Sequence, residues 1–181
     1  MPRNNYLSLP GRLVVIGIAI LITGCATTPN PARTRSAKSL FESTAREYHF
    51  PSAIATSTER ERLLAEAATG YERLLRQYPD QDDWCAKALR SLGNVRAEQG
   101  KLDVAVKLYA SVAEKYSRQD WEVLQAWKTA ADLLWEAGRQ DEAKKFYRKI
   151  IARFDQPNAA EVVKSVVRAA RWHLATGNAN S

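Results

Sequence analysis

Residues 100–109 read GKLDVAVKLY, and residues 138–147 read GRQDEAKKFY. The two stretches lie 38 residues apart and agree at a glycine, a small alanine and a closing tyrosine. A repeat at a fixed spacing of this size is the signature of an array of similar units. The same shift brings four columns into agreement three times: Ala67, Ala105 and Ala143; Tyr71, Tyr109 and Tyr147; Leu74, Val112 and Ile150; and Tyr78, Tyr116 and Phe154.

Each unit is predicted to be a pair of antiparallel helices. Apolar residues recur through these segments at spacings of three and four, which is the period of a helix with one buried face. Gly100 and Gly138 stand between the two helices of a pair, where a tight turn favours glycine. One pair cannot bury its apolar faces alone, so stacked pairs must share a core. The fold expected is therefore all-α, a stack of helix hairpins over residues 58–177.

These columns resemble the tetratricopeptide repeat (TPR), whose pattern has Leu-Gly in the first helix, then alanine and an aromatic residue in the second. The resemblance covers about residues 59–177 and implies a short TPR-like α-solenoid. The chain departs from the family in its longer period and in the absence of a clear first helix in the first unit. The matching residues are Leu89, Leu92-Gly93, Gly100, Ala105 and Tyr109 in one unit and Trp127, Ala131, Gly138, Ala143 and Tyr147 in the next.

In this family the first helices of the pairs line a groove that receives a segment of a partner protein. The resemblance therefore implies a groove here, and its side chains are mainly cationic. Trp135 is either an anchor for a partner's apolar side chain or part of the core. By the columns above, the groove consists of Lys87, Arg90, Asn94, Gln125, Lys128, Thr129, Asp132, Trp135, Lys164, Arg168 and Arg171.

Some relatives in this family hold the terminal carboxylate of a partner with a clamp of Lys, Asn, Asn, Lys and Arg. Lysine and arginine beside an amide donor can bind a carboxylate through charge-assisted hydrogen bonds. The resemblance therefore implies an acidic or carboxylate-bearing partner segment, and the alternative is a solvated face without a clamp. The matching positions carry Arg90, Asn94, Thr129, Lys164 and Arg168, with Arg90 in place of the first lysine and Thr129 as the departure from the pattern.

The first 25 residues differ in kind from the rest. Two arginines precede an apolar run at residues 13–22, which is too short for a settled membrane span and has the layout of a secretory signal. The end of this segment, Ile22-Thr23-Gly24-Cys25, resembles the lipobox of bacterial lipoproteins. The resemblance implies cleavage before Cys25 and acyl chains on that residue, which anchor the chain in a membrane. The alternative is a secreted protein in which Cys25 has no such role.

The organisation expected from the N-terminus onward has five parts. A signal peptide at residues 1–24 precedes a flexible tether at residues 25–38, which is rich in Pro, Thr, Ser and Arg. Residues 39–57 are expected to form a short helix followed by a linker, and the helix should end before Pro51, since proline disfavours helix at the residue before it. The repeat domain at residues 58–177 is followed by a disordered tail at residues 178–181. Lipoproteins kept in the inner membrane typically have Asp after the cysteine, and here Ala26 favours the outer membrane, facing the periplasm.

The sequence contains no motif that indicates catalysis, phosphate binding or metal binding. Neither His49 nor His173 has a Cys, Asp or Glu at metal-ligand spacing, and no phosphate loop or nucleophile motif occurs. No cofactor or metal is therefore expected, and the chain is not expected to be an enzyme. Cys85 is interpreted as a small buried hydrophobe, with a low-pKa thiol at a helix start as the alternative. The net charge of +7 is too dispersed for a nucleic-acid partner.

The function expected is that of an outer-membrane-anchored TPR lipoprotein that acts as a protein-binding scaffold in the bacterial envelope. The repeats would bind a protein partner, and the lipid on Cys25 would hold the complex at the membrane. The alternative is an accessory subunit of a cell-wall enzyme or a secretion complex, which positions a catalyst without doing chemistry.

Overall fold

The computed structural model describes residues 30–176, and all the regular structure in that part of the chain is helical. An N-terminal segment of three directly joined helices pairs with α3, two regular pairs follow, and α8 comes last. The elements are α1 (Pro31–Thr44), the π-helical turn η1 (Ala45–His49), α2 (Phe50–Ser52), α3 (Ser57–Gln77), α4 (Asp82–Glu98), α5 (Leu102–Lys115), α6 (Asp120–Glu136), α7 (Gln140–Phe154) and α8 (Glu161–Thr176).

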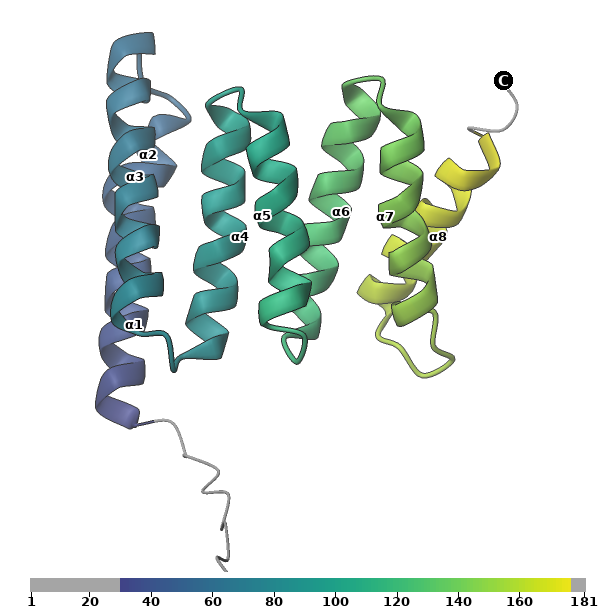
Figure 1. Ribbon diagram of the computed structural model, residues 1–181, viewed down its shortest axis with the longest axis horizontal. Helices are drawn as coiled ribbons and strands as arrows, with labels where there is room; N and C mark the ends of the chain where they lie inside the picture. Colours follow the sequence, from purple (N-terminus) through teal and green to yellow (C-terminus); the bar gives the residue numbers. More distant parts are fainter. Residues whose placement is uncertain (1–29, 177–181) are drawn as a thin grey trace, which may run out of the picture.

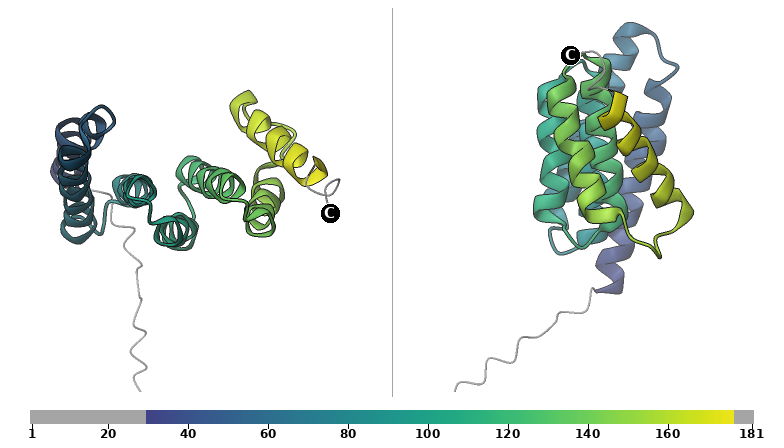
Figure 2. Two further views of the ribbon diagram at one scale, coloured as in Figure 1. Left: turned by 90° about the horizontal axis from the view of Figure 1, so that it is seen from above. Right: turned by 90° about the vertical axis from the view of Figure 1, so that its right-hand side faces the viewer.

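The helices stand side by side in one row of antiparallel neighbours (Figure 1). Seen from above, α4, α6 and α8 lie along one side of the row, and α5 and α7 lie along the other (Figure 2). Both ends of the row project toward the side of α4 and α6, so that side is the concave face of the array. The predicted TPR-like α-solenoid is confirmed. In residues 30–176, none of the helices combines the length and the apolar character that crossing a membrane requires.

The two glycine turns are as predicted. Gly100 and Gly138 have φ angles of +74° and +76°, a left-handed backbone that L side chains rarely adopt. In each turn the next residue closes the helix end, with Lys101 N–H donating to Arg96 and Arg139 N–H donating to Leu134. This hydrogen bond over five residues is typical of a glycine-ended helix. The glycines therefore reverse the chain at the same place in both regular pairs.

The predicted columns form the core. Each tyrosine of the second helices is buried, and the alanine four residues before it has no exposed surface in any of the three units. Glycine at position 93 lets Tyr109 pack close, because a Cβ atom there would lie 2.6 Å from the ring carbon Cε1. Small residues thus set the distance between paired helices, and the large aromatic residues fill the space beside them.

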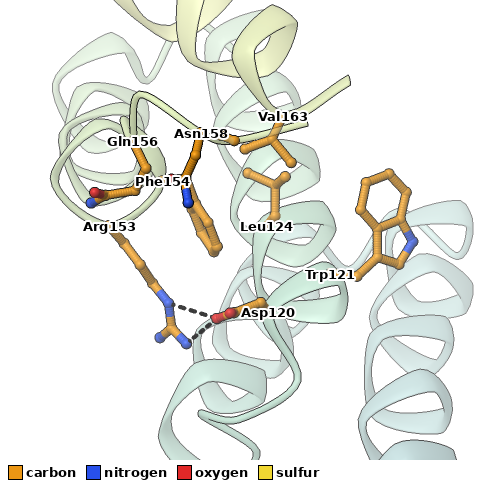
Figure 3. A pocket seen from close by; sticks show the side chains of 9 residues that line it. Asp120, Trp121, Leu124, Arg153, Phe154, Gln156, Asn158 and Val163 are labelled. Carbon is orange, nitrogen blue, oxygen red and sulfur yellow. Dashed lines mark hydrogen bonds and ion pairs between the residues drawn. The ribbon is translucent and has the colours of Figure 1, made fainter. Parts of the chain in front are cut away.

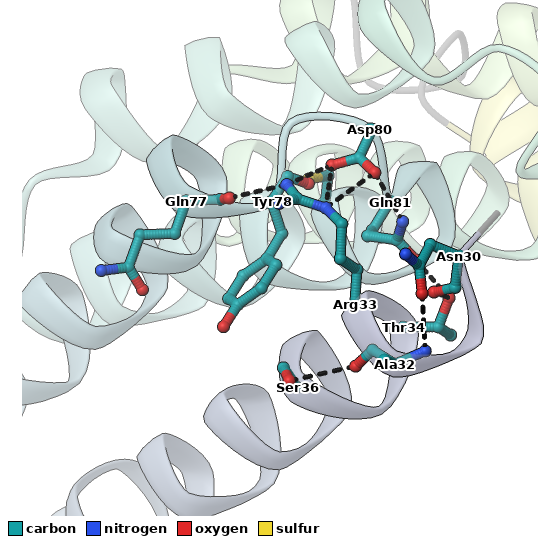
Figure 4. Close-up of polar contacts among 10 residues, drawn as sticks. Asn30, Ala32, Arg33, Thr34, Ser36, Gln77, Tyr78, Asp80 and Gln81 are labelled. Carbon is teal, nitrogen blue, oxygen red and sulfur yellow. Dashed lines mark hydrogen bonds and ion pairs between the residues drawn. The ribbon is translucent and has the colours of Figure 1, made fainter. Parts of the chain in front are cut away.

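The prediction of a tether at residues 25–38 is wrong from residue 31 onward. Pro31 occupies the first turn of α1, where its missing N–H is harmless, and Asn30 caps the helix by accepting from Ala32 N–H at 2.9 Å. The start of α1 is tied to the loop between α3 and α4 through Arg33, which donates to Asp80 (Figure 4). Proline and polar residues suggested a linker, but they begin a helix here. Residues 25–29 lie outside the described part, as do the predicted signal peptide and the tail.

The helix expected to stop before Pro51 continues through it to Ser52. The chain passes Pro51 by way of the π-helical turn η1, in which Phe50 N–H donates to Ala45 five residues back. This wider turn accommodates the proline, which has no N–H to donate. The segment from α1 to α2 packs against α3, so it supplies the first helix that the repeat pattern lacked in the first unit.

Candidate functional site

The residues predicted to line a groove all lie on α4, α6 or α8, the three helices along the concave side of the array (Figure 2). Most of their side chains are half-buried, whereas Arg168 and Arg171 are exposed. The structure therefore brings the predicted set to one side of the molecule. Their contacts decide what each of them can offer to a partner.

Arg90 is engaged within the chain. Its Nε atom donates to Oε2 of Glu122 at 2.6 Å, which joins α4 to α6. The Glu122 side chain is only 6% exposed, and that of Arg90 is 24% exposed. A buried carboxylate needs a paired cation, because taking an unpaired charge out of water is costly. Arg90 is therefore a structural residue, and a partner's carboxylate would have to compete with Glu122 for it.

Two further groove positions orient buried tyrosines. Tyr109 donates its hydroxyl hydrogen to Oδ1 of Asn94 at 2.8 Å, and Tyr147 donates to Oδ1 of Asp132 at 3.0 Å. In the first unit His49 takes this place, with its Nδ1 atom 3.0 Å from the hydroxyl of Tyr71. In each pair, a polar residue of the first helix thus forms a hydrogen bond with the buried hydroxyl group of the tyrosine on the second helix. In the sequence, the hydrogen-bond acceptor and the tyrosine are 15 residues apart in both regular pairs, so this spacing could have indicated the contact.

The remaining cations of the groove also have neighbours in the chain. Lys128 donates to Asp132 at 2.6 Å, and Lys164 donates to Glu161 at 3.1 Å. Lys87 differs, because its ammonium lies over the ring of Trp84 at 4.4 Å. Of the five positions matched to a carboxylate clamp, Arg90, Asn94 and Lys164 therefore already have partners, and Arg168 lies 3.9 Å from Glu161. In this structure the five residues are not preassembled as a clamp.

Trp135 belongs to an aromatic cluster that joins α6, α7 and α8. His173 stacks on Tyr147 at 4.6 Å with nearly parallel rings, and Trp135 meets the edge of the same histidine at 4.6 Å. Burial lowers the pKa of His173, and its Nδ1 atom has no hydrogen-bond partner within residues 30–176. Burial disfavours the charged form of Tyr147 as well, which for a tyrosine raises the pKa. These contacts favour a packing role for Trp135, which remains half-buried.

An apolar pocket of about 380 Å³ lies where the start of α6, the end of α7 and the loop before α8 meet (Figure 3). Its lining includes Trp121, Leu124, Phe154 and Val163, and an ion pair of 2.6 Å between Arg153 and Asp120 lies beside it. Trp121 is 48% exposed. Nothing in the sequence pattern indicates this pocket, because its residues come from three elements that meet only in the fold.

A second, more polar hollow of about 400 Å³ lies between the start of α3 and the end of α4. Arg60, Glu98 and Lys101 are among its lining residues. The Nε2 atom of His49 lies 3.0 Å from Glu98, and this hydrogen bond lowers the pKa of Glu98. The hollow is therefore lined by groups that already compensate one another's charge.

Cys85 is fully buried, and its Sγ atom donates to the carbonyl oxygen of Tyr78 at 3.1 Å. Burial raises the pKa of the thiol, so the interpretation as a buried hydrophobe is confirmed and the low-pKa alternative is wrong. Across residues 30–176, no group of His, Cys, Asp and Glu side chains is arranged to hold a metal ion.

Residues 84–156 match the family model of the tetratricopeptide repeat. The matched segment runs from α4 to just after α7 and so covers both regular helix pairs. No curated protein matches the chain. Over these two pairs the chain is thus similar to the tetratricopeptide repeat, a fold that serves protein–protein interaction and is generally non-catalytic.

Proposed function

We propose that this chain is a protein-binding scaffold held at a bacterial outer membrane, on its periplasmic side, by lipid on Cys25. The observation that carries the proposal is the similarity of residues 84–156 to the tetratricopeptide repeat, because this fold binds protein segments. The lipobox-like stretch Ile22–Cys25 supports the anchor. Two acyl chains or more hold a protein stably, whereas a single chain is marginal.

The binding surface proposed is the concave face between α4 and α8. Its least neutralised cations are Lys87, which lies over an aromatic ring, and Arg168, whose side chain is 66% exposed and 3.9 Å from Glu161. Gln125 and Thr129 on α6 lie between these two helices in the array and can donate or accept hydrogen bonds. An extended acidic segment that crosses from α4 to α8 would meet both cations and the polar groups between them. Arg90 is left out of this surface because it holds Glu122.

The binding surface can be tested by photo-crosslinking in cells. A photoreactive phenylalanine analogue at Gln125 on the concave side is compared with the same analogue at Arg148, an exposed residue on α7. We expect a discrete crosslinked protein from position 125 and none from position 148. Crosslinks from position 148 alone would overturn the assignment of the concave face.

The anchor can be tested separately with Cys25→Ser. We expect the variant to keep its helical circular dichroism signal but to move from the membrane fraction to the soluble fraction. The matched control is Ala26→Ser, which introduces the same hydroxyl one residue later and leaves the thiol in place. If Cys25→Ser stays in the membrane fraction as completely as the control, lipid on Cys25 is not what holds the protein there.

A further inference from the structure

One edge of the array gathers the start of α1 and the loops α3–α4, α5–α6 and α7–α8 (Figure 1). We name it the anchor edge and define it by residues 30–33, 78–81, 116–119 and 155–160. The opposite edge, which we name the glycine edge, holds the turns at residues 99–101 and 137–139. The helices alternate in direction and the regular ones are similar in length, so the two edges stay separate along the row.

The start of α1 is fixed to the anchor edge by several contacts (Figure 4). The Arg33 guanidinium donates to Asp80 at 2.7 Å and to the carbonyl oxygen of Gln77 at 3.0 Å. Thr34 donates to Oε1 of Gln81 at 2.5 Å. These bonds link the first turn of α1 to the loop between α3 and α4. A pull on the chain before Asn30 is therefore transmitted to the whole array rather than to a separate helix.

The chain between the anchor and this edge is short. Residues 26–29 are all that separate Cys25 from Asn30, and fully extended chain spans about 3.5 Å per residue, roughly 17 Å in total. Helix α4 has 17 residues, which corresponds to about 26 Å from one edge to the other. With lipid on Cys25 in the bilayer, the anchor edge can therefore lie at the membrane surface. The glycine edge lies about a helix length farther from Cys25.

Of the exposed large hydrophobic side chains, Trp121 and Val162 lie at the anchor edge, whereas the more exposed Phe50, Ile54 and Trp172 lie on other parts of the array. Trp121, 48% exposed, lies at the start of α6 on the anchor edge, beside the apolar pocket (Figure 3). Tryptophan is enriched where protein meets the headgroup region of a bilayer, because its ring is amphipathic. The anchor edge thus carries both the attachment point of the chain and an exposed tryptophan.

From these observations we infer that the anchor edge faces the bilayer surface and that the helices stand away from it, with the glycine edge outermost. The inference rests on the proposed lipid on Cys25 and adds an orientation to it. In this orientation the concave face opens sideways, parallel to the membrane. A partner segment that crosses from α4 to α8 would then run along the bilayer surface, within about a helix length of it.

The test uses the full lipidated chain in vesicles of phosphatidylethanolamine and phosphatidylglycerol. Single cysteines are introduced by Ser117→Cys on the anchor edge and by Gln140→Cys near the glycine edge, both at exposed positions. Each is labelled with an environment-sensitive fluorophore, and quenching by nitroxide-bearing lipids is measured. We expect quenching at position 117 to be several-fold stronger than at position 140. Twenty Gly/Ser residues inserted after Ala26 should reduce that difference, because they release the edge from the bilayer.

Equal quenching at both positions in vesicle-bound protein would overturn the orientation and leave the anchor intact. Stronger quenching at position 140 would do the same. If the protein does not float with the vesicles, the anchor itself fails, and the orientation falls with it. Flotation and quenching are read from the same sample, so the two failures are distinguishable.

Discussion

The two places where neighbouring first helices meet, α4 with α6 and α6 with α8, are built differently. Between α4 and α6, Arg90 reaches across to the buried carboxylate of Glu122. One repeat later Lys128 takes the place of Arg90, but it pairs with Asp132 on its own helix. The carboxylate of Glu161, in the place of Glu122, is 78% exposed. The second junction relies instead on aromatic contacts, in which His173 stacks on Tyr147 and Trp135 meets both rings edge to face.

This difference shows that a repeat keeps its packing more strictly than its charges. Alanine and tyrosine keep the same burial in both regular pairs, whereas charges at equivalent positions have different partners. The interior junction is fixed by a directional ion pair, and the terminal one by aromatic contacts around a half-buried histidine. The two junctions should therefore respond differently to substitution and to pH.

The largest expected effect is at the interior junction. Arg90→Met leaves Glu122 buried without its cation, and removing one partner of a buried pair costs about 3 kcal/mol in the free energy of unfolding. Lys128→Met, the equivalent change one repeat later, breaks only a half-exposed pair within one helix and should cost about 0.5 kcal/mol or less. Urea unfolding followed by circular dichroism measures both values. Equal losses in the two variants would remove the distinction between the junctions.

A double variant separates the ion pair from simple loss of packing. Arg90→Met together with Glu122→Leu replaces both charges by apolar groups, so no charge remains buried. Such replacements are often neutral or stabilising. We expect the double variant to recover most of the stability that Arg90→Met alone loses. No recovery would mean that the arginine acts through its aliphatic contacts.

The next effect concerns the distance between the two packed helices of each pair. In Gly93→Ala the new methyl group would meet the ring of Tyr109, which has no exposed surface and is held by Asn94. We expect a net loss of about 2 kcal/mol, because overpacking outweighs the roughly 1 kcal/mol that alanine gains over glycine in a helix. Ala131→Gly, at the same column of the next pair, should cost about 1 kcal/mol through lower helix propensity. A Gly93→Ala variant more stable than the native chain in urea would contradict this account.

The turns should show no difference between the two pairs. Gly100 and Gly138 have nearly the same φ, and a Cβ atom at either position would meet no atom within 4 Å. Gly100→Ala and Gly138→Ala should therefore each cost about 1 kcal/mol through backbone strain alone. Thermal unfolding of the two variants provides the comparison. A clearly larger loss in one of them would reveal a contact that distinguishes the pairs.

The pattern of small and aromatic residues was enough to predict the helix pairs, because packing allows few choices at those columns. Gly93, Ala105 and Tyr109 occupy positions where volume is fixed by the neighbouring helix. The N-terminal segment escaped prediction for the opposite reason. Pro31 and Pro51 suggested linker and helix end, and only tertiary packing on α3, with a π-helical turn, makes that segment helical.

The candidate site was predictable by location but not by contacts. The family resemblance placed Arg90, Asn94 and Asp132 on the first helices, and the structure places them there. Each has a partner on another helix, with Glu122 lying 32 residues after Arg90, and Asp132 also pairs with Lys128 on its own helix. A repeat pattern assigns residues to a face, whereas ion pairs across units depend on side-chain reach that the pattern does not contain. The groove as a binding site stays a prediction.

The smallest effect expected is a pH dependence specific to the terminal junction. Burial lowers the pKa of His173, while the carboxylate of Asp132 opposes this shift and Lys128 reinforces it. Because the folded-state pKa lies below the unfolded value of about 6.5, the unfolded chain binds the proton more readily. The histidine's contribution to stability is therefore present above that pH and lost as pH falls through the folded-state pKa. In His173→Phe, which keeps a ring on Tyr147, the free energy of unfolding should fall less between about pH 7.5 and about pH 5 than in the native chain. An identical fall in both proteins would show that the aromatic junction is as insensitive to pH as the interior one.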